Sequence, residues 1–141
     1  MTTAVLITYY MPHVMAAIVL VALVFTPVPS KPRFFVREVL ALAVACFIAH
    51  INREFELWPA YRYFASGHMS FCLGASLSLG LLRPFTLLIT LPLLIPYGSA
   101  LVLLGFHRAI DVMGAIPIVL LVYALVRRWW RIPFTPIPSP S

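Results

Sequence analysis

The sequence predicts an all-α integral membrane protein, a bundle of about five transmembrane helices. Of its 141 residues, 62% are hydrophobic and only 10% are charged, and the mean hydropathy is +1.00. A water-soluble domain of this length would carry more charge on its surface. The apolar runs are continuous rather than alternating, which favours helices over the strands of a β-barrel. We therefore expect residues 1–141 to form a single multi-pass membrane domain.

Five apolar segments follow one another along the chain, at residues 4–25, 34–50, 69–82, 85–106 and 109–130. The first lacks the basic start of a secretory signal peptide, so it is interpreted as a retained span. The second and third are shorter than the roughly 20 residues that a crossing helix needs. We expect them to borrow flanking residues or to lie among other helices. A proline-rich tail follows at residues 132–141, since repeated proline disfavours a continued helix.

The positive charge predicts topology rather than nucleic-acid binding. The net charge is +6, but the basic residues lie at the ends of apolar runs and form no basic face. Five crossings would place seven basic residues on one side of the membrane, namely Lys31, Arg33, Arg37, Arg83, Arg127, Arg128 and Arg131. The other side would hold Arg53, Arg62 and Arg108. The richer side is expected to be cytoplasmic. This orientation places the C-terminus in the cytoplasm, and the N-terminus and the loop before the third segment outside it.

Two short motifs carry the chemistry that we expect. Ser66-Gly67-His68 opens the third segment, and His107 with Asp111 opens the fifth. The chain crosses twice between them, so both motifs should lie at the same, extracytoplasmic face. A spacing of four residues would place His107 and Asp111 on one face of a helix. The carboxylate could then fix one ring nitrogen and leave the other as a base or nucleophile.

The remaining groups of this face suit a phosphate substrate. A second imidazole at His68 could protonate a leaving oxygen. The backbone N–H groups opened by Ser66 and Gly67 could bind an anion at the start of a helix. The predicted cations of this face, Arg53, Arg62 and Arg108, are the candidate partners of the phosphate charge. Neither a metal nor an organic cofactor is required, and Cys46 and Cys72 lack metal-ligand spacing.

Between residues 50 and 128 these motifs resemble the type 2 phosphatidic acid phosphatase superfamily, including its phosphotransferase branch that contains the sphingomyelin synthases. The resemblance implies that His107 attacks phosphorus to form phosphohistidine and that Asp111 orients it. It implies that His68 acts as acid and then base, while Ser66 and Gly67 bind phosphate oxygens. The implied substrate is a lipid phosphate, a phosphodiester or a polyprenyl pyrophosphate. The implied enzyme is a phosphoric ester hydrolase or a lipid phosphotransferase.

The sequence also departs from the phosphatase pattern. Ala65 stands where these enzymes usually have proline, and Leu101 stands where they usually have arginine. Their upstream basic motif is absent, which leaves Arg53 and Arg62 as partial substitutes. The phosphotransferase branch also lacks the arginine at the position of Leu101, which favours transfer over hydrolysis.

Two other functions stay open at this point. The chain could be a catalytically degenerate relative that binds lipid or serves as an assembly subunit of a membrane complex. A small transporter is a weaker alternative, because the sequence shows no paired repeats or interrupted helices. The small size also leaves room for a homo-oligomer that closes the site.

Overall fold

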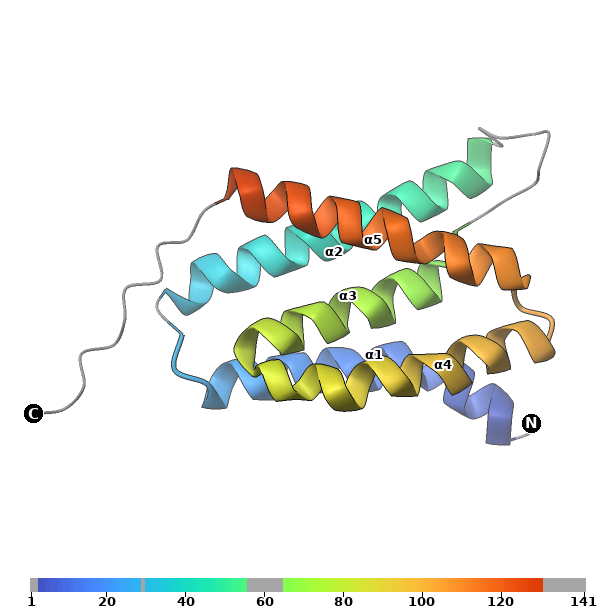
Figure 1. Cartoon of the computed structure of the whole chain (residues 1–141), viewed down its shortest axis with the longest axis horizontal. Helices are drawn as coiled ribbons and strands as arrows, with labels where there is room; N and C mark the ends of the chain where they lie inside the picture. The colour runs from blue at the N-terminus through green and yellow to red at the C-terminus, as the bar shows by residue number, and fades with distance from the viewer. Residues whose placement is uncertain (1–2, 29, 56–64, 131–141) are drawn as a thin grey trace, which may run out of the picture.

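The computed structural model describes residues 3–28, 30–55 and 65–130, and every regular element in this part of the chain is helical. The prediction of an all-α bundle is confirmed. The elements are α1 (Thr3–Phe25), α2 (Lys31–Phe55), α3 (Gly67–Leu82), the short 3-10 helix η1 (Pro84–Thr86), α4 (Leu87–Leu103) and α5 (Ala109–Trp129). Successive helices run back and forth along one long axis (Figure 1).

Four of these helices are long and apolar enough to cross a membrane, which indicates a multi-pass membrane protein. The candidate spans are Val5–Phe25, Lys31–Ile51, Pro84–Leu103 and Ala109–Trp129. The second segment borrows flanking residues, as expected, because α2 has 25 residues and extends beyond the apolar run at both ends. The polar residues 31–33 and 52–54 lie outside the apolar segment predicted at 34–50, but they are helical and form the two ends of α2.

Helix α3 is the shortest of the five and lies at the centre of the bundle. Its 16 residues rise about 24 Å, less than the thickness of a typical hydrocarbon core. It contacts each of the other four α-helices, with α2 and α5 on one side and α1 and α4 on the other (Figure 1). Protein rather than lipid therefore surrounds α3, which explains how a short helix with buried serines can lie at this depth.

Small side chains allow the helices to approach α3 closely. A Cβ atom on Gly74 would lie 2.8 Å from Cδ1 of Leu42 and 2.9 Å from the hydroxyl oxygen of Tyr123. Helices α2, α3 and α5 thus meet at a position that has no room for a side chain. Ala45 and Ala115 are also fully buried in this core. Small residues at contacts between helices are typical of membrane bundles.

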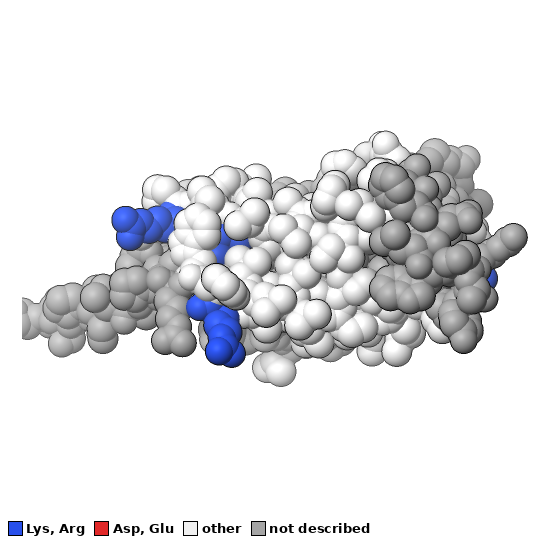
Figure 2. Space-filling view, turned by 90° about the horizontal axis from the view of Figure 1, so that it is seen from above, with Lys and Arg blue, Asp and Glu red and all other residues white. Residues whose placement is uncertain are grey.

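The two ends of the bundle differ in the residues they carry. We call residues 65–68 with 104–111 the histidine end, and residues 30–38, 78–83 and 123–130 the arginine end. The start of α3 and the start of α5 meet at the histidine end (Figure 1). Figure 2 shows Lys and Arg side chains gathered towards the arginine end, while the middle of this face carries no charged residue that is drawn in colour. The basic residues here include Lys31, Arg33, Arg83 and Arg128.

Candidate functional site

The first motif forms the start of α3. Ser66 is the N-cap residue, and its hydroxyl oxygen accepts a hydrogen bond of 3.2 Å from the backbone N–H of Met69. This bond satisfies one of the free N–H groups of the first turn. The side chain of Ser66 is fully buried. A Cβ on Gly67 would meet no atom within 4 Å, so the backbone at Gly67 borders open space.

The second motif lies in the turn between α4 and α5. Gly105 has a φ of 73°, a left-handed conformation that glycine adopts without strain. The N–H groups of Phe106 and His107 both donate to the carbonyl of Leu101, at 3.0 and 3.1 Å. This turn ends α4 and holds the backbone of His107 against it.

His107 lies outside α5, so the expectation that His107 and Asp111 share one helix face is wrong. The helix begins at Ala109, and Arg108 is its N-cap residue. The carboxylate of Asp111 accepts a hydrogen bond of 3.1 Å from the N–H of Arg108. An acidic side chain in the first turn also interacts favourably with the helix dipole. Asp111 thus fixes the residue that follows His107, and it is buried, with 5% of its surface exposed.

A main-chain hydrogen bond joins the two motifs. The N–H of Ser66 donates to the carbonyl of Asp111 at 2.9 Å. The start of α3 and the first turn of α5 are therefore held together without the help of a side chain.

The two histidines converge at this junction. The ring centroids of His68 and His107 are 6.0 Å apart, and the ring planes are inclined by 62°. His68 is exposed and His107 is partly buried. Partial loss of hydration lowers the pKa of His68 below its ordinary value of 6.5, so the neutral ring is favoured at neutral pH. The imidazole in the first turn of α3 and the imidazole of the turn between α4 and α5 thus lie next to each other.

A polar pocket lies beside His107, and an apolar groove adjoins it. The pocket has a volume of about 510 Å³ and is lined by Val102, Gly105, Phe106, His107, Arg108, Ala109 and Asp111. The groove has a volume of about 770 Å³ and runs between α3, α4 and α5. Val102 and Ala109 line both spaces. A molecule with a polar head and a long apolar chain would match this pair of cavities.

The structure places only one of the three arginines expected at this site beside the pocket. Arg108 lines the pocket, its side chain is 57% exposed, and its Nε atom lies 3.8 Å from the carboxylate of Asp111. Arg53 lies in the last turns of α2, and the position of its side chain is not described. Arg62 lies outside the described residues. Leu101, at the position where the phosphatases usually have arginine, is fully buried.

No group of three or more His, Cys, Asp or Glu residues that could hold a metal ion occurs within the described ranges. Cys46 and Cys72 are free thiols.

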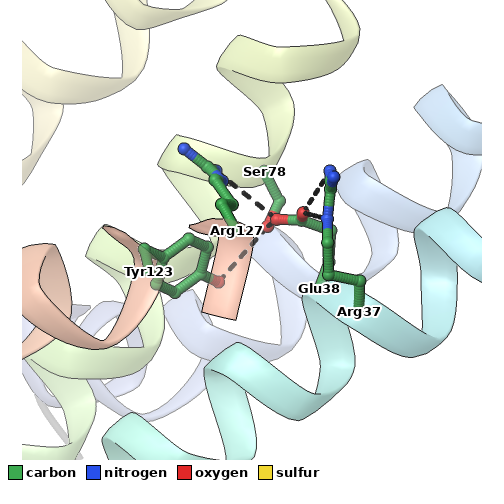
Figure 3. A network of polar contacts seen from close by, with 5 residues as sticks. All are labelled: Arg37, Glu38, Ser78, Tyr123 and Arg127. Atoms are coloured by element: carbon green, nitrogen blue, oxygen red, sulfur yellow. Dashed lines mark hydrogen bonds and ion pairs between the residues drawn. The ribbon is translucent and has the colours of Figure 1, made fainter. Parts of the chain in front are cut away.

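Sequence reasoning missed a second polar cluster, at the arginine end. Figure 3 shows the carboxylate of Glu38 between the side chains of Arg37 and Arg127, with Ser78 and Tyr123 beside it. Both Arg37 and Glu38 are about 95% buried. Glu38 is an acidic residue within an otherwise apolar segment, and that was the sequence signal that could have indicated this cluster.

The fold and the histidine end together define a helical membrane bundle with a pocket lined by His107, next to the ring of His68. No family model, curated protein or solved structure matches this chain.

Proposed function

We propose that the protein is a membrane-embedded lipid phosphatase or phosphotransferase that acts through a phosphohistidine intermediate. The distance of 6.0 Å between the rings of His68 and His107 carries the proposal. That spacing leaves room for a phosphoryl group to contact one ring nitrogen of each residue, since such contacts are about 3 Å long. The resemblance of the two motifs to the type 2 phosphatidic acid phosphatases supports the same chemistry.

In the proposed reaction a ring nitrogen of His107 attacks phosphorus. A nitrogen–phosphorus bond forms, and the bond from phosphorus to the leaving oxygen breaks. His68 donates a proton to that oxygen and afterwards removes one from the attacking water or lipid hydroxyl. Attack by this second nucleophile breaks the nitrogen–phosphorus bond and releases the product. Bound phosphate would raise the pKa of His68, which favours its protonated form in the first step.

The cavities support a lipid as substrate. The polar pocket would hold the phosphate beside His107 and Arg108, and the apolar groove would hold an acyl or prenyl chain between α3, α4 and α5. The charge distribution supports an extracytoplasmic histidine end, because the basic residues concentrate at the arginine end.

The test is turnover by purified protein in detergent micelles. Phosphatidic acid, polyprenyl pyrophosphate and sphingomyelin would be supplied in turn, with and without a lipid alcohol as acceptor. We expect phosphate release or headgroup transfer from at least one substrate, and a loss of at least about 10³-fold in His107→Ala. His13→Ala is the matched control, because His13 lies on α1 and stacks against Tyr9 instead of lining the pocket. Equal turnover by wild type and His107→Ala would refute the proposal.

The second candidate is a catalytically degenerate lipid-binding or assembly subunit. The burial of Leu101 favours it, since the arginine usual at that position in the phosphatases is replaced by a core residue with no polar group. Lipid binding that requires the phosphate headgroup, without any turnover in the assay above, would support this candidate.

A further inference from the structure

The cluster at the arginine end contains more positive than negative charge. Arg37 and Arg127 carry two guanidinium groups, whereas Glu38 is the one carboxylate within hydrogen-bonding or ion-pairing distance of them among the described residues. Tyr123 and Ser78 are neutral members. Guanidinium groups stay protonated in proteins. The cluster therefore has a net charge of about +1 when Glu38 is ionised.

Both carboxylate oxygens of Glu38 already have close partners other than Arg127. Its Oε1 atom accepts a hydrogen bond of 2.8 Å from Nε of Arg37, and Nη2 of Arg37 lies 2.8 Å from the same oxygen. Its Oε2 atom accepts a hydrogen bond of 2.7 Å from the hydroxyl of Ser78. Arg127 approaches Oε2 only to 3.6 Å, too far for a strong hydrogen bond.

Two guanidinium nitrogens of Arg127 lack a hydrogen-bond acceptor. Its Nε and Nη2 atoms are buried and have no hydrogen-bond partner among the described residues, whereas Nη2 of Arg37 is ion-paired with Glu38 at 2.8 Å. Aromatic rings cover part of each group, with Phe34 under Arg37 at 5.2 Å and Tyr123 under Arg127 at 5.0 Å. A ring face attracts a cation but accepts no strong hydrogen bond. An anion with several oxygens would supply the missing acceptors.

Arg127 gives an anion access to the cluster. It lies in the last turn of α5, and its side chain is 30% exposed. Trp129 and Trp130 lie two and three residues further along and are exposed, as is typical of residues at the boundary between lipid tails and headgroups. The cluster is thus near the level at which headgroup phosphates lie.

We infer that the arginine end is a second phosphate-binding site, separate from the histidine pocket, in which Arg127 binds the phosphate oxygens and Arg37 contributes the excess positive charge. The ligand class is a phosphate monoester or diester with net negative charge. An anionic phospholipid of the leaflet at this end and free phosphate share this chemistry.

The test measures thermal unfolding of the purified protein in an uncharged detergent. Phosphatidylglycerol, phosphatidylcholine and inorganic phosphate are added separately. We expect phosphatidylglycerol to raise Tm by about 5 °C or more near saturation, and zwitterionic phosphatidylcholine to do much less. A matching rise with inorganic phosphate would identify the phosphate group itself as sufficient, and a rise with phosphatidylglycerol alone would identify the lipid as the source.

Variants assign the effect to the cluster. Arg127→Gln should lose most of the rise in Tm, and Arg127→Lys should keep part of it, because lysine retains the charge but not the planar fork. Arg128→Gln is the matched control, since Arg128 is the exposed neighbour in the same turn. His107→Ala should keep the rise, which separates this site from the proposed catalytic pocket. The inference is overturned if no anion stabilises the protein, if Arg128→Gln loses as much as Arg127→Gln, or if His107→Ala alone abolishes the effect.

Discussion

The two ends of the bundle differ in how far their polar side chains are buried and hydrogen-bonded. At the arginine end, Glu38 is enclosed by α2, α3 and α5, and hydrogen bonds occupy both of its oxygens. At the histidine end, His107 lines a pocket and is partly buried, and the neighbouring His68 is exposed. Buried charge that is paired contributes to the fold, whereas an open imidazole is available to react. We therefore expect substitutions at the arginine end to change stability and those at the histidine end to change activity.

The largest expected effect is on turnover. His68→Ala should lower the rate of the proposed reaction by about 10²- to 10⁴-fold, because it removes the general acid and base. The free energy of unfolding should change by less than about 0.5 kcal/mol, since the side chain is exposed. Parallel measurements of turnover and thermal unfolding check both expectations, with His13→Ala as control. A large loss of stability with little loss of turnover would reverse the comparison.

The next effect is on stability at the opposite end. Glu38→Gln should destabilise the fold by about 3–5 kcal/mol, because it leaves two guanidinium groups without a carboxylate in a buried cluster. Unfolding in detergent, monitored by circular dichroism, measures the change. Arg128→Gln serves as the comparison, since Arg128 is exposed, and it should change stability by less than about 0.5 kcal/mol. Equal stability of Glu38→Gln and wild type would show that the cluster contributes nothing to folding.

A smaller loss of stability should follow from Gly74→Ala. The new methyl group would lie within 3 Å of Leu42 and Tyr123, and relief of that overlap should cost about 1–3 kcal/mol. Gly114→Ala is the matched control, because no atom lies within 4 Å of its Cβ position. Alanine there should be neutral or slightly stabilising, since it favours the helix. If both variants unfold at the same temperature, the close contact around Gly74 has no energetic consequence.

The smallest effect is a dependence on pH. Loss of hydration lowers the pKa of His68 below 6.5, so the neutral ring needed as a base is present at pH 7 and is lost as the pH falls through that lowered pKa. Release of the phosphohistidine intermediate should therefore slow as the pH falls through the pKa of His68, which the neighbouring phosphoryl group raises relative to the free protein. Single-turnover measurements of intermediate decay between pH 5 and 8 would detect this, and a decay rate that falls with rising pH would contradict it.

The sequence predicted the helices well but not all of their limits. Continuous apolar runs indicate membrane helices, yet Lys31 and Asn52 lie beyond the apolar run and are still helical in α2. The position of His107 was also misjudged, because the left-handed turn at Gly105 ends one helix and delays the next until Ala109. Hydropathy carries no signal for either boundary.

The two polar sites differed in how far the sequence could reveal them. Counting crossings was enough to expect that His68 and His107 lie at one end, and their ring centroids are 6.0 Å apart there. The catalytic roles of these residues stay predictions. The cluster around Glu38 depends on Ser78, which is 40 positions away, and on Tyr123, which is 45 positions further. No local pattern joins these residues, and Arg37 and Arg127 resemble ordinary charges at the ends of spans.

The hydrogen bond from the N–H of Ser66 to the carbonyl of Asp111 has a consequence for divergence among relatives of this chain. Because only main-chain atoms form it, any residue except proline at position 66 can preserve it. The bond ties the first turn of α3 to the first turn of α5 without using any side chain that lines the groove. Substitution of groove residues on α4 therefore leaves both the donor and the acceptor of this bond in place.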